Sequence, residues 1–400
     1  MRRGISFVLA LVACPGLAVA ADWDPYSAPA NAFERRVQAA AFGEPGADRI
    51  LQDWLAAHPQ LTAEQRLQGY RQLCNDYDAL TWFRLRLTAC TEYVRLKSGL
   101  FNDTDSSALA FADQPPVRGI GSAKVPLTWN RFGCQSVDVI ANGTKSAWFV
   151  DTGAQITVVR AALAKQMGVR ILATHMGMGT TTADVSGQAG IIDSLRIGDA
   201  IVENVPVIVL PDSQLNVPHD GQIDGILGLQ VMVAFGRVAW TDGGNSLALG
   251  EAAPKARAIA PRIYWQEEGV GVPIRTERGV MGAFLDTGAN RTDWRMAGTA
   301  LLDPKQLSSA DEQVRHVGGA GGIVELKERR LRNVSFYLGA QPVRLASVPL
   351  SADKRSAAKI GMDAVSQFET FILDFEQMRL DGSLKIASMP KAKRAAGAHK

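Results

Sequence analysis

The sequence predicts a mostly β protein in which two tandem β lobes follow an α-helical N-terminal domain. Three observations support this prediction. Residues 33–98 place apolar side chains at helical spacing, β-branched residues alternate with small and polar ones from Gly119 onward, and one set of motifs occurs twice in the β-rich part. With 400 residues, 46% of them hydrophobic, the chain is long enough to bury the cores of two or three domains.

The N-terminus predicts export. Residues 1–20 contain the parts of a secretory signal peptide: a basic start, an apolar run from Ile5 to Ala13, and small residues ending at Ala20. We therefore expect a periplasmic or secreted protein. The alternative is a lipid anchor, because the residues that end at Cys14 resemble a bacterial lipobox, and an acylated Cys14 would tether the protein to a membrane. Cleavage after Ala20 is favoured, since Pro15 and the glycine after it break the apolar segment.

Residues 21–101 are predicted to form the helical domain. Thr62 followed by Gln65 predicts a capping box, and Gly99 marks the end of the last helix. The helical pairs resemble the hairpins of tetratricopeptide-type modules, with too few visible repeats to name that family. A packing or positioning role is favoured over peptide binding, and over a pro-segment that occludes a cleft.

An exported protein tolerates disulfides, and Cys74 and Cys90 in the helical domain are the predicted pair. Their loop would contribute about 3 kcal/mol in the chain-entropy model. Cys134 is predicted to be a buried small residue rather than a nucleophile. The cysteines and histidines lack the spacing of a zinc site, so no metal and no cofactor are expected.

Composition changes mark the other boundaries. The polar, proline-containing residues 102–118 are predicted to be a linker, and the Pro- and Ala-rich residues 252–262 a second one. They delimit two β lobes at 119–251 and 263–388, and the basic tail 389–400 is predicted to be disordered. Lysine plus arginine (43) nearly balance aspartate plus glutamate (40) without a basic stripe, so no nucleic-acid partner is expected.

The β-rich part repeats its motifs in the same order. Phe149-Val150-Asp151-Thr152-Gly153-Ala154 returns as Phe284-Leu285-Asp286-Thr287-Gly288-Ala289, and Ile226-Leu227-Gly228 returns as Lys359-Ile360-Gly361. A single Asp-Thr-Gly is weak evidence, because it arises by chance in about one chain in ten at average composition. Two copies in matched contexts, each after a short apolar strand, present an aspartate at a loop that a sheet holds.

These paired motifs resemble the aspartic peptidases, and the retropepsin-like branch more than the pepsin branch. The resemblance covers residues 119–388 and not the helical region. It implies two acid-protease β lobes in one chain, hence a catalytic monomer that acts on a peptide or protein substrate. It also implies that Asp151 and Asp286 are catalytic, while Thr152, Gly153, Thr287 and Gly288 support the dyad.

The implied reaction needs two carboxylates, because one accepts a proton from water while the other donates a proton to the substrate carbonyl. Carboxylates about 3 Å apart share a proton and titrate as a coupled pair. The residue after each Asp-Thr-Gly is alanine, where pepsin-like enzymes usually carry a hydroxyl residue. Because the ionised dyad loses that donor, we predict a less acidic pH optimum than that of gastric-type enzymes.

Glycine-rich segments after each motif are candidate substrate-binding flaps, with ordinary hairpin turns as the alternative. Neither contains a tyrosine, which departs from the pepsin pattern and favours the retropepsin-like interpretation. Flaps of this family close over an extended peptide and pair with its backbone. The predicted flap residues are Met176, Gly177, Met178 and Gly179 in the first lobe and Gly318 and Gly319 in the second.

The second lobe departs from the family pattern at a few positions. Lys359 stands where the family has an apolar residue, and Arg291 or Asp293 near the dyad would perturb it or select charged substrates. The sequence therefore leaves two functions open. The favoured one is an aspartic-type endopeptidase, and the alternative is a non-catalytic periplasmic protein that keeps the fold and binds extended peptides.

Overall fold

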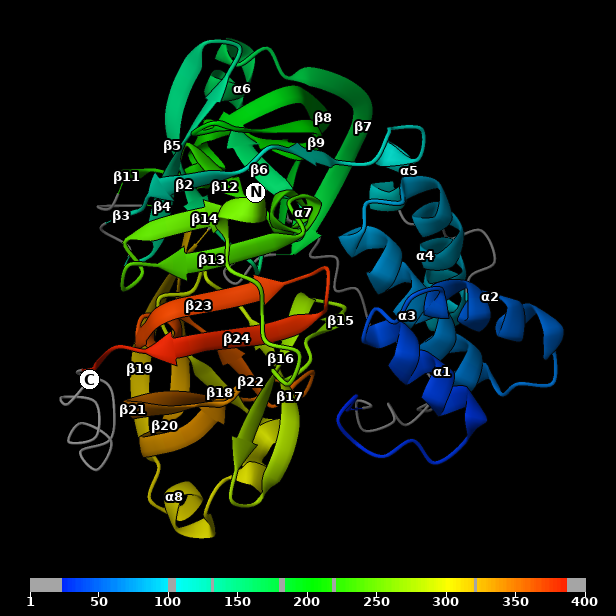
Figure 1. The fold of residues 1–400 in the computed structure, drawn as a ribbon, viewed down its shortest axis with the longest axis vertical. Helices are drawn as coiled ribbons and strands as arrows, with labels where there is room; N and C mark the ends of the chain where they lie inside the picture. The colour runs from blue at the N-terminus through cyan, green and yellow to red at the C-terminus, as the bar shows by residue number, and fades with distance from the viewer. Residues whose placement is uncertain are drawn as a thin grey trace, which may run out of the picture.

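A computed structural model describes residues 24–99, 106–130, 133–179, 184–217, 221–319 and 322–386 of the chain. The predicted signal peptide, Cys14 and the predicted tail from residue 389 lie outside the described residues. Figure 1 shows a helical part to one side of a β body, in which two β units lie one above the other. In the part of the chain that the structure describes, no helix combines the length and apolar character needed to cross a membrane.

The helical part begins where local capping signals predict helices. The predicted capping box of Thr62 and Gln65 is present, and Gly99 ends the last helix with a left-handed φ of 73°. An apolar core that includes Phe33, Leu51 and Tyr77 holds the helices together. The four helices are α1 (Ala32–Ala41), α2 (Ala47–Ala57), α3 (Ala63–Ala79) and α4 (Phe83–Ser98).

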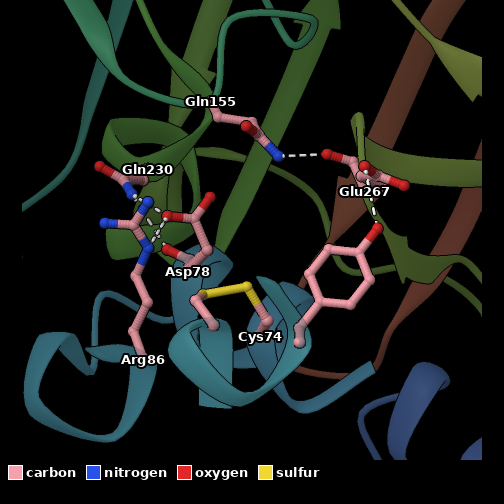
Figure 2. The surroundings of a disulfide bond; sticks show 8 residues. Cys74, Asp78, Arg86, Gln155, Gln230 and Glu267 are labelled. Atoms are coloured by element: carbon pink, nitrogen blue, oxygen red, sulfur yellow. Dashed lines mark hydrogen bonds and ion pairs between the residues drawn. A yellow bond between two sulfur atoms is a disulfide. The ribbon is translucent and has the colours of Figure 1, made fainter. Parts of the chain in front are cut away.

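The predicted disulfide joins Cys74 of α3 to Cys90 of α4. Their Cα atoms are 4.7 Å apart, within the range that a disulfide spans. The bond therefore holds the two longest of these helices side by side, next to the surface that meets the β body (Figure 2).

The segment predicted as a linker, 102–118, differs from that prediction because it contains a helix, α5 (Ser106–Phe111). Phe111 is fully buried, and its ring lies 5.8 Å from that of Phe83 in α4. The helix also contacts β7 of the first β unit. Proline and polar residues dominate the composition of this segment, but burial of Phe111 and Ala108 stabilises one turn of helix against two neighbours.

The first β unit is a nine-stranded sheet with the order β1-β9-β6-β12-β5-β4-β8-β7, to which β3 adds at β4. Strand β8 pairs with β9 and also with β4, so the sheet curls into a barrel-like unit. Its strands are β1 (Arg118–Ile120), β3 (Thr128–Trp129), β4 (Gln135–Ala141), β5 (Thr144–Val150), β6 (Thr157–Arg160), β7 (Arg170–Gly179), β8 (Asp184–Ile197), β9 (Ala200–Leu210) and β12 (Gly225–Leu227).

The second β unit is an eight-stranded sheet with the order β15-β16-β17-β22-β18-β21-β20-β19, closed by a further pairing of β16 with β20. Its strands are β15 (Tyr264–Gln266), β16 (Gly269–Thr276), β17 (Gly279–Leu285), β18 (Asp293–Arg295), β19 (Asp311–Gly319), β20 (Gly322–Leu338), β21 (Gln341–Ser351) and β22 (Ala358–Ile360).

Short elements connect these strands. In the first unit they are α6 (Ala161–Gln166), η1 (Asp212–Leu215), β10 (Asn216–Val217), β11 (Gly221–Gln222) and α7 (Leu229–Ala234); η2 (Gly250–Ala252) follows. In the second unit they are η3 (Met296–Leu301), α8 (Pro304–Ser308) and α9 (Met362–Val365).

A third sheet joins the two units and combines strands that the sequence analysis assigned to separate lobes. Its order is β2-β14-β13-β23-β24, and β13 pairs antiparallel with β23 (Figure 1). Trp240 of β13 lies opposite Phe371 of β23, both fully buried. The strands are β2 (Ala123–Pro126), β13 (Arg237–Thr241), β14 (Ser246–Leu249), β23 (Phe368–Asp374) and β24 (Arg379–Leu384).

The predicted second linker, 252–262, is held against this shared sheet. The backbone N–H of Ala256 donates to the Asp374 carboxylate (3.1 Å), and Arg257 forms a bidentate ion pair with Asp381. The connection between the two units is therefore anchored along its length.

Polar contacts join the helical part to both β units, as Figure 2 shows. Gln230 of α7 donates to the backbone carbonyl of Asp78 (3.0 Å), and the Asp78 carboxylate accepts from Arg86 (2.7 Å). Glu267, which lies between β15 and β16, accepts from the Tyr93 hydroxyl of α4 (3.3 Å), and its carbonyl accepts from Gln155. Glu267 therefore links α4 to Gln155, which follows Asp151 by four residues.

Candidate active site

Asp151 and Asp286 both lie where a central strand ends. Asp151 follows β5, and the parallel strand β12 holds it, because its backbone N–H donates to the Leu227 carbonyl (3.1 Å). Asp286 follows β17 and donates in the same way to Ile360 of the parallel strand β22 (2.9 Å). The strand that leads into Gly228 or Gly361 therefore runs beside each aspartate loop, as the family resemblance implies, although Lys359 replaces an apolar residue in the second copy.

The threonines of the two motifs interlock across the junction of the units. The Thr287 N–H donates to the Thr152 hydroxyl (3.1 Å), and the Thr152 N–H donates to the Thr287 hydroxyl (3.0 Å). Each hydroxyl then donates to a carbonyl of the other unit, that of Leu285 (2.8 Å) or Val150 (2.9 Å). Both threonines are buried, so these four bonds fix the separation of the two loops in a dry environment.

Backbone N–H groups surround the two carboxylates. Oδ1 of Asp151 accepts from Gly153 (2.7 Å) and from Gly288 of the opposite unit (3.2 Å), and Oδ1 of Asp286 accepts from Ala289 (2.9 Å). A Cβ atom on Gly288 would lie 2.2 Å from Cγ of Asp151, and one on Gly153 would lie 2.7 Å from Oδ1 of Asp286. The carboxylates approach the backbone so closely that only glycine fits at these two positions.

The two carboxyl groups lie close together, since a Cβ on Gly153 would be 2.7 Å from Oδ1 of Asp286 and 3.1 Å from Oδ1 of Asp151. Burial, followed by the neighbouring charge of Asp286, raises the pKa of Asp151 to about 7. Asp151 nevertheless keeps part of its surface exposed. A carboxyl that holds its proton near neutral pH and remains accessible is suited to donate that proton in general acid catalysis.

The predicted flap segments lie at the ends of two long β hairpins. In the β7–β8 hairpin Met176 pairs with Gly187 and is buried, while Gly177, Met178 and Gly179 continue toward the turn. In the β19–β20 hairpin Gly318 pairs with Ile323 and Gly319 with Gly322. The hairpin form agrees with both interpretations made from the sequence, so the flap role stays a prediction.

Cys134 lies next to the dyad, although the sequence analysis expected only a buried small residue. It is 3% exposed, and its Sγ donates to the carbonyl of Gly288 (3.0 Å). Burial, with the charges of Asp151 and Asp286, raises the pKa of the thiol to about 12. The thiol is therefore protonated at neutral pH and contributes packing rather than a nucleophile.

Lys359 is the residue of this site whose role the sequence analysis did not identify. Its Nζ lies 3.4 Å from Oδ2 of Asp286 and 3.6 Å from Oδ2 of Asp293. The sequence did contain a signal for this role: Lys359 is charged, whereas the matching position of the first repeat is the apolar Ile226. Arg291 is exposed, and a Cβ on Gly361 would meet its backbone at 2.4 Å.

Residues 137–231 match the aspartyl protease family. The matched segment contains Asp151 and the strand β12, and ends before the second motif. Among solved structures, the chain resembles the crystal structure of basic 7S globulin from soybean, with 11% identity and a TM-score of 0.42, over 66% of this chain and 94% of that chain. No curated protein matches the chain.

The aspartyl-protease-like site contains no metal centre that the described residues reveal. Across the described ranges, histidine, cysteine, aspartate and glutamate do not gather in groups of three or more that would hold a metal ion. The two neighbouring carboxyl groups can transfer protons, and Lys359 is the adjacent cation.

Proposed function

We propose that this chain is an aspartic-type endopeptidase that hydrolyses peptide bonds with a water activated between Asp151 and Asp286. The observation that supports it best is the four-bond threonine interlock, which holds the two aspartate loops so that their carboxyl groups lie close together. A structural or storage role would not require two carboxyls to be brought together at the cost of burying them.

The reaction follows from the coupled pair. A dyad that carries one proton and one negative charge presents a base and an acid to the two sides of a scissile carbonyl. The base accepts a proton from water as the oxygen attacks, and the acid protonates the carbonyl oxygen. The proton on the base then passes to the leaving nitrogen, so no covalent enzyme intermediate forms.

The repeat of the motifs supports an architecture of tandem copies, in which one chain supplies both halves of the site and acts as a monomer. The retropepsin-like resemblance supports the glycine-rich hairpin ends as the flaps that bind an extended peptide. The signal-peptide pattern supports a periplasmic or secreted location, with a Cys14 lipid anchor as the less favoured alternative.

The test is hydrolysis of a fluorogenic peptide library by purified residues 21–400 between about pH 3 and 8. Asp151→Asn and Asp286→Asn should each lower kcat by about 10²- to 10⁴-fold, because each removes one member of the acid–base pair. Asp138→Asn is the matched control, since that aspartate lies in the first β unit with an exposed side chain.

The second candidate is a non-catalytic protein that binds extended peptides. It would use the same hairpins, but it would not need the aspartates to ionise. It predicts that a folded wild-type protein leaves the whole library intact, while a labelled peptide still binds. It also predicts that Asp151→Asn binds the peptide as tightly as the wild type. Cleavage that disappears in both aspartate variants and persists in the control excludes it.

A further inference from the structure

The two aspartates of the dyad differ in the charges that surround them. Asp151 accepts from two backbone N–H groups, and among the described residues no cation forms an ion pair with it. Asp286 accepts from one N–H group and also faces the Lys359 ammonium at 3.4 Å. The two aspartates therefore differ both in their backbone donors and in the charge beside them.

The asymmetry originates in one strand register. Lys359 of β22 lies opposite Phe284 of β17, just as Ile226 of β12 lies opposite Phe149 of β5. The isoleucine is neutral, whereas the lysine side chain is only 14% exposed and directs its charge at Asp286. A lysine buried to this extent is stabilised by nearby carboxylates, because desolvation alone would favour its neutral form.

The neighbours of Lys359 confirm that its charge is balanced by carboxylates. Burial lowers the pKa of Lys359, but Asp286 and then Asp293 outweigh it, with a smaller opposing effect from Arg295, so the net pKa is raised. Arg295 is itself paired with Glu268 (2.6 Å) and Asp353 (3.3 Å). Cys134 is a further titratable group that the charges of Asp151, Asp286 and Lys359 influence, and its thiol is neutral at neutral pH.

The charge of Asp293 is shared in turn with the hairpin of the second β unit. Arg315 of β19 lies 3.1 Å from Asp293 and 2.8 Å from Glu328 of β20. Arg315 and Lys359 therefore share the Asp293 carboxylate, whereas among the described residues Lys359 is the cation paired with Asp286. An alternating row of buried or half-buried charges results: Asp286, Lys359, Asp293, Arg315, Glu328 and Arg330.

We propose that Lys359 is a positioning residue that keeps Asp286 as the ionised member of the dyad, so that the shared proton lies on Asp151. The two carboxyls then have fixed roles. Asp286 accepts a proton from water as the water oxygen bonds to the scissile carbon, and Asp151 gives its proton to the carbonyl oxygen as the C=O double bond becomes single. When the C–N bond breaks, Asp286 returns its proton to the nitrogen and Asp151 regains one from the hydroxyl.

This assignment rests on the proposed function for its chemistry, but its electrostatic part is measurable without turnover. Loss of a cation this close to a carboxylate moves its ionisation upward by about 1 to 3 pH units. In Lys359→Met the first ionisation of the dyad, and with it the acidic limb of the kcat/KM profile, should therefore move to higher pH. Asp293→Asn removes a neighbouring negative charge and should move both in the opposite direction.

The experiment is a carboxyl NMR titration of the full chain labelled with ¹³C-aspartate, in which the Asp286 signal is assigned by its loss in Asp286→Asn. The pH profile of cleavage is measured beside it. Ile226→Met, the matching position of the first β unit, controls for repacking and should leave the ionisation in place. If Lys359→Met does not fold, Lys359→Met combined with Asp293→Asn removes both partners and still predicts an upward shift relative to Asp293→Asn alone.

A shift of less than about half a pH unit in folded Lys359→Met, or in the double variant relative to Asp293→Asn alone, overturns the proposal. So does an equal shift in Ile226→Met, because the effect would then come from packing. If the carboxyl signal moves as expected but no peptide is cleaved by the wild type, the role of Lys359 in charging Asp286 stands and the proposed function fails. Lys359→Arg, which keeps the charge, should retain the wild-type acidic limb.

Discussion

The threonine interlock allows a quantitative prediction. Thr152→Val keeps the shape of the side chain but removes a hydroxyl that donates to the Leu285 carbonyl and accepts from the Thr287 N–H. Both of these backbone groups belong to the second β unit and lie in the buried junction. Each buried group left without a partner costs about 1–3 kcal/mol, so the loss of partners for these two groups should lower the unfolding free energy by about 2–6 kcal/mol.

Thr152→Val should also reduce turnover, beyond the loss of unfolding free energy. The same hydroxyl sets the approach of the two aspartate loops, so its loss should separate the carboxyls and lower kcat more than it raises KM. Urea unfolding, followed by tryptophan fluorescence, and peptide cleavage measure the two effects. Thr144→Val in β5 is the matched control because its hydroxyl bonds at an exposed site, and it should change stability by less than about 0.5 kcal/mol.

Two further variants show whether the interlock acts as one unit. Thr287→Val should resemble Thr152→Val, and the double variant should cost less than the sum of the two, since the four bonds share partners. Thr152→Ser should restore much of the stability. The reasoning is refuted if Thr152→Val, measured beside its control, loses less than about 0.5 kcal/mol and keeps full turnover.

The remaining predictions concern pH and the disulfide. The pKa of Asp151 is raised to about 7 in the folded state, against about 3.9 in an unfolded chain. The protonated carboxyl therefore contributes its full stabilisation of the folded state below about pH 4, and this contribution is lost as the pH rises through about 7. Asp151→Asn should therefore flatten the decline of urea stability between about pH 4 and 8, and an unchanged slope would contradict the burial of this carboxyl. Peptide cleavage should fall as the pH exceeds about 7, because the dyad loses its last proton, and activity confined below about pH 3.5 would contradict this. Replacement of Cys74 and Cys90 by serine should destabilise the helical part by about 3 kcal/mol, visible in calorimetry as an earlier transition of that part; coincident transitions in wild type and variant would show that the disulfide adds nothing.

Much of the candidate site was predictable because it depends on local sequence. A short apolar strand, an aspartate, a small hydroxyl residue and a glycine define each loop, and the close approach to Gly288 explains why that position excludes any side chain. The capping box at Thr62 and the disulfide of the helical part were predictable for the same reason, since both follow from spacing within one or two helices.

Other features depended on contacts between residues far apart in the chain. The helix α5 forms in a segment whose composition indicates a linker, because burial of Phe111 outweighs its local preference. The shared sheet depends on the pairing of β13 with β23. The sequence of neither strand indicates which strand it will pair with. Strand pairing at such separation depends on which edges the two units leave open, and only the assembled fold decides that.

The role of Lys359 depends on both the local sequence and the tertiary structure. The sequence by itself determined that a lysine replaces an apolar residue beside the second motif, and that two Asp-Thr-Gly loops follow two apolar strands. Only the tertiary structure decided that the ammonium reaches Asp286 rather than solvent, and that Asp293 and Arg315 complete its surroundings. The physical reason is that the effect of one charge on another depends on their distance and burial. A local sequence pattern predicts a strand or a loop, but it does not predict the distance between side chains that belong to different strands and loops.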